Sequence, residues 1–229
     1  MSAAIWLLLL APVVLALGVQ ALLRAVFRHY RAVPNHTGAT GAEIARGLLD
    51  AHGLQDVQLE LVPGFLTDHY DGEARTLRLS EAVAGERSVA ALGIAAHEVS
   101  HAYQDAEGDR AYRARHSIGE QLAQFAPWSA IFLIGGFWFG IPVFIVLSLV
   151  FVGGLVLFAL ATLPVEFGAS HRALMLLKET GLADESEMRG ARRAPRAAAQ
   201  TYVVGLLDRL AYFLVVLFLA EAARRAASA

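Results

Sequence analysis

The sequence has no cysteine and few charges: 17% of its 229 residues are charged, with 19 Lys and Arg against 21 Asp and Glu. Without cysteine, disulfide scaffolds, thiol catalysis and cysteine-ligated metal sites are excluded. Without a basic excess, the usual electrostatic signature of nucleic-acid binding is missing. A soluble domain is about 25% charged, whereas this chain is 56% apolar with a mean hydropathy of +0.49. The composition predicts a membrane protein that contacts the lipid bilayer and no nucleic acid.

The first apolar segment, residues 1–24, has the length that a bilayer core requires. No basic residue precedes the apolar run, whereas Arg24, Arg28 and Arg31 follow it. A secretory signal peptide carries its basic residues before the apolar run. We therefore expect a retained transmembrane helix here rather than a cleaved signal.

A longer apolar block covers residues 120–165. Between Glu120 and Glu166 lie 45 uncharged positions, which are enough for two spans. Gly140 and Pro142 interrupt the block, and such residues punctuate helices. We expect a transmembrane helical hairpin that divides near these two residues.

The last apolar segment, residues 201–222, completes four expected transmembrane helices. It contains Asp208 and Arg209, and adjacent opposite charges in an apolar helix are costly unless they pair or face a polar cavity. We expect them to pair with each other near the membrane interface. Basic residues are concentrated in 24–119 and 166–200, so the positive-inside rule places both stretches in the cytoplasm of a multi-pass cell-membrane protein.

The polar stretch of residues 32–119 has the pattern of a small α+β domain. Thr40 and Glu43 fit a capping box for a helix over residues 42–52, and Gly53 stands at its C-terminal end. Alternating apolar residues over 57–61 predict a strand.

Two further strands are expected at Leu66–Tyr70 and Thr76–Leu79, joined at the turn dipeptide Asp71-Gly72. The three strands predict a short antiparallel sheet. An apolar, alanine-rich run that follows Ser88 predicts a long helix to about Arg115.

That long helix contains His97-Glu98-Val99-Ser100-His101, an HExxH motif. Residues four apart lie on one face of a helix, so both imidazoles can bind one Zn²⁺ per chain. Glu98 is then placed to accept a proton from a metal-bound water that attacks a carbonyl. The motif predicts His97 and His101 as metal ligands and Glu98 as the general base.

A catalytic zinc site needs a third protein ligand. Glu120 lies 19 residues after His101, a spacing that soluble zinc peptidases use, but it begins a membrane span. Glu166 lies 65 residues after His101, and two spans would return it to the side of the membrane where His101 lies. We favour Glu166 and keep Glu120 as the alternative.

Four segments together resemble the YugP-type neutral zinc metallopeptidases of bacterial membranes, a resemblance that covers most of the chain: LTDHYD (Leu66–Asp71), LRLS (Leu77–Ser80), SVAALGIAAHEVSHAYQ (Ser88–Gln104) and LPVEFGASHRAL (Leu163–Leu174). That family in turn resembles the HtpX and CAAX-prenyl-protease branch of membrane gluzincins. The resemblance implies that His97, His101 and Glu166 are the zinc ligands and that Glu98 is the catalytic base.

The chain departs from this pattern at two serines. Ser100 replaces the glycine that usually precedes the second histidine. Ser170 stands where the CAAX-protease branch has an aspartate that would orient a ligand histidine, and a hydroxyl supplies no charge for that role. Asp105 and Asp68 are the alternative partners for a ligand imidazole.

Three residues are candidates for stabilising the oxyanion of the reaction: His69, Tyr103 and His171. The cluster Asp68–Asp71 fits a hairpin edge that can pair with an extended peptide better than it fits a second metal site.

Together, these observations predict a mainly α membrane protein with a small zinc-peptidase domain. The expected activity is that of an integral membrane zinc metalloendopeptidase, which cleaves a peptide or protein substrate that can itself be membrane-associated. The alternative is a non-catalytic zinc-binding membrane protein for storage, sensing or architecture. The oligomeric state is left open.

Overall fold

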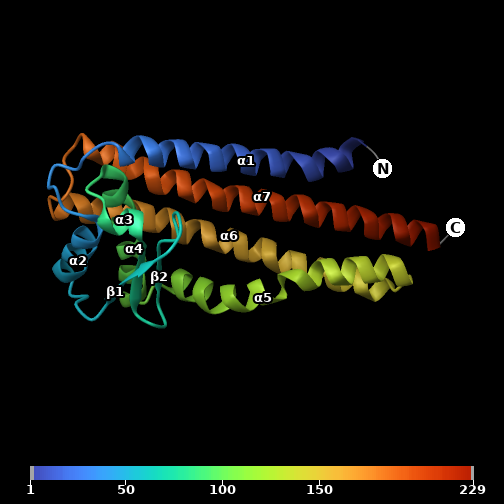
Figure 1. Cartoon of the computed structure of the whole chain (residues 1–229). Helices are drawn as coiled ribbons and strands as arrows, with labels where there is room; N and C mark the ends of the chain where they lie inside the picture. Colours follow the sequence, from blue (N-terminus) through green and yellow to red (C-terminus); the bar gives the residue numbers. More distant parts are fainter. Residues whose placement is uncertain (1–2, 228–229) are drawn as a thin grey trace. The chain divides into compact units, whose positions relative to one another are not determined.

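The computed structural model describes the backbone of residues 3–227, and it describes their side chains except those of 3–9, 12, 120, 121, 123–126, 198, 219 and 222–227. The chain has seven helices and three strands in this part, shown in Figure 1: α1 (Ala3–Arg31), α2 (Gly41–Ala51), β1 (Gln58–Val62), β2 (His69–Asp71), β3 (Thr76–Ser80), α3 (Glu81–Gly85), α4 (Val89–Ala106), α5 (Arg110–Phe139), α6 (Pro142–Glu179) and α7 (Glu187–Ala227).

The chain forms two compact units. Unit 1 consists of Met1–Val19, Ala114–Leu163 and Thr201–Ala229, and unit 2 consists of Gln20–Arg113 and Pro164–Gln200. Four of the helices therefore contribute residues to both units. All of the strands belong to unit 2.

Helix α2 in unit 2 begins as its sequence predicts. The Thr40 side chain accepts a hydrogen bond from the backbone N–H of Glu43, and the Glu43 carboxylate accepts one from the backbone N–H of Thr40. This capping box satisfies two N–H groups that a helix start leaves without partners. Gly53 follows the helix with φ +75°, a conformation that favours glycine.

The three expected strands form, but the expected antiparallel sheet is wrong in one pairing. The strand order is β1-β3-β2, in which β2 pairs with β3 antiparallel and β1 pairs with β3 in parallel. An alternating pattern indicates which side chains are buried, but not the direction of the neighbouring strand. The central strand β3 has Leu77 and Leu79 fully buried.

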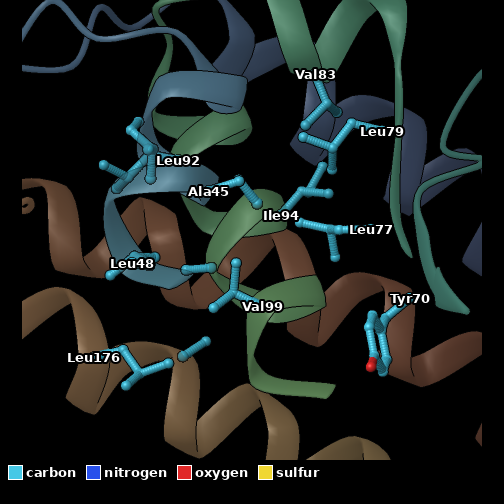
Figure 2. Packing of buried hydrophobic residues seen from close by; sticks show 14 of the residues in the cluster. Ala45, Leu48, Tyr70, Leu77, Leu79, Val83, Leu92, Ile94, Val99 and Leu176 are labelled. Carbon is cyan, nitrogen blue, oxygen red and sulfur yellow. The ribbon is translucent and has the colours of Figure 1, made fainter. Parts of the chain in front are cut away.

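Helix α4 is the centre of unit 2. Nearly every side chain from Val89 to Ala102 is buried, as expected for a helix that is apolar on all sides. The cluster around α4 includes Ala45 and Leu48 of α2, Leu77 and Leu79 of the sheet, Val83 of α3 and Leu176 of α6, as Figure 2 shows.

The expected long helix from Ser88 to Arg115 is interrupted. Helix α4 ends at Ala106, and α5 begins at Arg110. Between them Gly108 has φ +74°, and Asp109 accepts hydrogen bonds from the backbone N–H groups of Ala111 and Tyr112. This aspartate cap starts a new helix, a local signal that the sequence reading missed.

The break expected near Gly140 and Pro142 is confirmed. Helix α5 ends at Phe139, Gly140 has φ +64°, and α6 begins at Pro142, a position where proline loses no helical hydrogen bond. In unit 1 the two helices meet through a hydrogen bond from the Ser148 hydroxyl to the backbone carbonyl of Ser129 (2.7 Å) and a stacked Phe132–Phe151 pair.

Among the residues whose side chains the structure describes, three helices are long and apolar enough to cross a membrane: Val13–Arg31, Pro142–Glu179 and Glu187–Phe218. A fourth apolar helical segment, Pro127–Phe139, is shorter, so the number of four spans stays a prediction. Large apolar side chains of unit 1 are exposed, among them Trp138, Val150 and Leu157, which is the surface expected of helices that face lipid.

The expected ion pair between Asp208 and Arg209 is absent from the described part of the chain. Arg209 Nη1 instead donates a hydrogen bond to the backbone carbonyl of Gly205, 2.8 Å away and one turn earlier in α7. The two side chains therefore do not neutralise each other as the sequence reading supposed.

Helices α4 and α7 approach closely at Gly93. A Cβ atom added to Gly93 would lie 2.8 Å from the carbonyl oxygen and 2.9 Å from the Cα of Ala191. Gly47, on the exposed face of α2, has no such neighbour within 4 Å. We expect Gly93→Ala to destabilise the protein by about 1–3 kcal/mol. Gly47→Ala should stabilise it by about 1 kcal/mol, because alanine has the higher helix propensity.

Thermal unfolding of the detergent-purified variants measures both effects. The account of this helix crossing is contradicted if Gly93→Ala is as stable as the wild type.

Candidate metal centre

The two histidines of the HExxH motif meet a glutamate from another helix inside unit 2. His97 and His101 lie on α4, and Glu166 lies on α6. His97 Nε2 is 3.4 Å from Glu166 Oε2, and His101 Nε2 is 3.8 Å from Glu166 Oε1. All three side chains are buried, and one ligand atom from each lies within 4.8 Å of the others.

The spacing of these atoms fits a shared cation. Two ligand atoms that each lie 2.0–2.1 Å from a tetrahedral zinc ion are roughly 3.3–3.4 Å apart. The separation of His97 Nε2 and Glu166 Oε2, 3.4 Å, matches this value, and that of His101 Nε2 and Glu166 Oε1, 3.8 Å, exceeds it by about 0.4 Å. Two neutral imidazoles and one carboxylate are also a donor set that zinc prefers in catalytic sites. The residues present therefore fit a zinc ion.

Each imidazole is also contacted at its other nitrogen. His101 Nδ1 is 2.9 Å from Gln104 Oε1, and Gln104 Nε2 donates to the backbone carbonyl of Val165 at 3.3 Å. His97 Nδ1 is 3.4 Å from the Ser170 hydroxyl. Because the Gln104 oxygen can only accept, it selects the tautomer of His101 with the proton on Nδ1, and this orients Nε2 towards Glu166. The Ser170 hydroxyl can donate or accept, so it contacts His97 without selecting its tautomer. Gln104 thus links α4, which carries both histidines, to the backbone beside Glu166.

Of these two partners, the sequence reading identified Ser170 and missed Gln104. Gln104 follows His101 by three residues, so it lies beside it on the same helical face. This spacing was the signal that could have identified Gln104. Its second contact, with the backbone carbonyl of Val165 on α6, depends on how the two helices pack, and the sequence does not reveal that packing.

Two further glutamates were candidates: Glu98 as the general base and Glu120 as the alternative third ligand. Glu98 is buried on α4, adjacent in sequence to the ligand candidate His97. Glu120 lies within α5, and its side chain is outside the described part of the structure. The structure therefore brings Glu166 to the two histidines and leaves the role of Glu120 untested.

Asp105 lies one turn after His101 on α4, and a hydrogen bond joins it to Tyr70 of the sheet. The Tyr70 hydroxyl donates to Asp105 Oδ2 at 3.0 Å, and burial together with the Asp105 charge raises the pKa of Tyr70, which keeps the phenol protonated. The Tyr112 ring, buried at the start of α5, has its centroid 5.8 Å from that of His101. Tyr112 was not predicted as a neighbour of His101, because the break at Gly108 that starts α5 was not predicted.

The polar side chains of the cluster from Asp68 to Asp71 form their hydrogen bonds and ion pairs within and around the β2–β3 hairpin. Asp68 accepts hydrogen bonds from the backbone N–H and the hydroxyl of Ser80, and burial nevertheless raises the pKa of its carboxyl group. His69 Nδ1 contacts the backbone carbonyl of Thr67. Asp71 accepts hydrogen bonds from its own turn and pairs with Arg78 at 2.6 Å. Within the described residues, none of the cluster joins a group that could hold a metal.

Tyr103 and His171, two candidates for stabilising the oxyanion, have other surroundings in the structure. The Tyr103 ring contacts His52 edge-on and carries the Arg172 guanidinium over its face at 5.0 Å. Arg172 also pairs with Glu107 at 2.5 Å, which joins the end of α4 to α6. His171 is exposed on α6. Among the described residues, neither group of side chains that could hold a metal includes His69 or His171.

A second group with metal-ligating atoms, His36, Asp184 and Glu187, has a structural explanation. Asp184 Oδ1 accepts from the backbone N–H of Glu187 at 2.8 Å, and Glu187 Oε2 accepts from the backbone N–H of Asp184 at 2.9 Å. His36 Nδ1 lies 2.6 Å from Glu187 Oε2. These contacts form a reciprocal cap at the start of α7 and attach the segment after α1 to it.

Comparison with known proteins agrees with this geometry. A protein family described as "Putative neutral zinc metallopeptidase" matches residues 5–221. The chain is 39% identical over 203 residues to the "Putative membrane protease YugP" of Bacillus subtilis (strain 168). The aligned residues cover 89% of this chain and 90% of that protein. No solved structure matches the chain. Together with the long apolar helices, the membrane protease relative indicates a membrane protein.

The contact between Gln104 and His101 yields a test. We expect Gln104→Leu to lower zinc affinity about 10- to 100-fold, because the imidazole loses its orienting acceptor. Gln104→Glu keeps an acceptor oxygen and should retain most of the affinity. Ser170→Ala should have a smaller effect than Gln104→Leu, because the contact of Ser170 with His97 is longer. Competition with a fluorescent zinc chelator measures all four affinities. Wild-type affinity in Gln104→Leu would show that Gln104 does not position the ligand.

Proposed function

The chain belongs to the neutral zinc metallopeptidase family, and from this membership we propose that it is an integral membrane zinc-dependent endopeptidase. The single observation that carries the proposal is the buried group of His97, His101 and Glu166, which two helices assemble from positions 65 residues apart. We propose these three as the ligands of one zinc ion, and the third-ligand position agrees with the proposed relation to the HtpX and CAAX-prenyl-protease branch.

Glu98 is proposed as the general base. It precedes Val99 on the buried helix that carries both histidines, and its neighbour His97 offers Nε2 to the ligand group. His97, His101 and Glu166 would hold the zinc ion, which would supply Lewis acidity to activate water and to polarise the substrate carbonyl. Glu98 accepts the proton of the attacking water and later donates it to the leaving amine.

The substrate is proposed to bind as an extended peptide along β2. This strand lies at an edge of the sheet, so the backbone groups on its outer side are available to an added strand. β2 packs against α4, and the Tyr70–Asp105 hydrogen bond ties it to the helix one turn after His101. A peptide paired with β2 would be held beside the helix that carries the ligands, and pairing through the backbone accepts many side-chain sequences.

The catalytic domain is proposed to lie in the cytoplasm, as the distribution of basic residues predicts. Unit 2 holds nearly all of these residues, including Arg24, Arg28 and Arg31 of α1 and the arginines at the start of α7. The substrates would then be cytoplasmic peptides or unfolded proteins, including those at the membrane.

Glu98→Gln separates an enzyme from a protein that only binds zinc. We expect the cleavage of unfolded casein to fall at least about 100-fold, since the general base is lost, while the zinc content stays at the wild-type level. Glu81→Gln, the same substitution at an exposed position in the first turn of α3, is the matched control and should keep its activity. If Glu98→Gln cleaves casein at the wild-type rate, the proposed catalytic role is wrong.

The choice of the third ligand is tested by metal analysis of the purified protein. Glu166→Gln should lower the zinc bound per chain, because two imidazoles remain where three protein ligands are needed. Glu120→Gln should bind zinc as the wild type does. The opposite result would assign the third ligand to Glu120.

A further inference from the structure

Four arginines at the start of α7 form one basic face in unit 2. Arg189, Arg192, Arg193 and Arg196 follow the spacing i, i+3, i+4 and i+7, which places them on the same side of the helix. All four are exposed. With the exposed Lys178 from the last turn of α6, they line a cavity of about 520 Å³, whose other lining residues are Ala183, Glu185 and Met188.

These cations have few anionic partners. Arg193 Nη1 donates to the Tyr30 hydroxyl at 3.1 Å. In the described part of the chain, no carboxylate forms an ion pair with any of the five basic residues that line the cavity. Glu187 is engaged by His36 and by the cap of α7, and Asp184 belongs to the same cap. The cavity therefore presents five positive side chains and the one carboxylate of Glu185.

Such a face is unfavourable for the helix by itself. Arginines three and four residues apart on one face repel each other, and each of the four has such a neighbour. The opposite face of the same segment is buried, with Ala191 and Ala194 packed in the core of unit 2. Because this opposite face is packed in the core, the helix cannot rotate to carry the arginines away from the cavity. A bound anion would relieve this repulsion, and guanidinium groups bind phosphate through paired hydrogen bonds.

The position of the face along α7 indicates the source of the phosphate. Arg196 precedes the apolar segment that begins at Thr201 by five residues of the same unbroken helix. Basic residues next to a membrane segment are attracted to anionic lipid headgroups, and basic pockets at that level bind them. The cavity is within the size range of small-molecule sites, and Ala183 and Met188 provide apolar contact for the glycerol part of a headgroup.

We propose that this basic cavity binds the headgroup of an anionic phospholipid. The lipid phosphate lies among the guanidinium groups of Arg189, Arg192 and Arg196. Because α7 packs against α4 at Gly93, the bound lipid stabilises the helix that supports the HExxH segment. This inference does not depend on zinc or on peptidase activity.

The test compares two lipids and two matched variants of the full chain in neutral detergent. Native mass spectrometry with added dioleoylphosphatidylglycerol or dioleoylphosphatidylcholine measures lipid binding. Arg192→Gln/Arg196→Gln removes two charges from the cavity. Arg24→Gln/Arg28→Gln removes two exposed charges with the same i, i+4 spacing from α1. Thermal unfolding without added lipid checks that both variants are folded.

We expect the wild type and the α1 variant to bind phosphatidylglycerol more tightly than phosphatidylcholine. The cavity variant should lose about tenfold in phosphatidylglycerol affinity. The proposal is overturned if the two lipids bind equally, or if the two variants lose the same affinity. It is also overturned if inorganic phosphate or a single-stranded oligonucleotide at micromolar concentration displaces the lipid from the wild type.

Discussion

A buried carboxylate held between two buried imidazoles is the interaction on which unit 2 depends. Polar groups of this kind are costly in a protein interior unless they are paired or bind a cation. The surrounding residues are arranged to hold them in place. Alanines and Gly93 let α4 pack closely against its neighbours. Gln104 contacts both His101 and the backbone beside Glu166, so that one side chain links α4 to α6 at this group.

The three proposed ligands lie on both sides of the apolar block along the chain. Between His101 and Glu166 lie α5 and the whole of the uncharged, 45-residue apolar block. A metal that bound His97, His101 and Glu166 would close this loop and restrict the unfolded chain, as any cross-link between distant positions does. Insertion of the apolar hairpin and completion of the proposed site would then favour each other. The peptidase domain and its membrane segments would form one cooperative structure.

Features that depend on residues close together in the sequence could be predicted, and features that depend on tertiary packing could not. The capping box at Thr40 and the helix start at Pro142 depend on neighbouring residues, and both predictions are confirmed. The parallel pairing of β1 with β3 and the contact of Gln104 with Val165 depend on tertiary packing, which periodicity does not encode. Glu166 lies between these two cases: two membrane spans would return it to the side of His101, which favoured it over Glu120, and the family resemblance implied the same residue. The family itself is confirmed by the comparisons, whereas the ligand set remains a proposal.

The central claim is that one zinc ion is bound by two imidazoles of α4 and one carboxylate of α6. X-ray absorption spectroscopy at the zinc edge of the purified, zinc-loaded protein tests it most directly. The account predicts two imidazole nitrogens, with the remaining ligands oxygen, at about 2.0–2.1 Å from the metal. A spectrum with one imidazole or none, or a protein that retains no zinc after gel filtration, would contradict it.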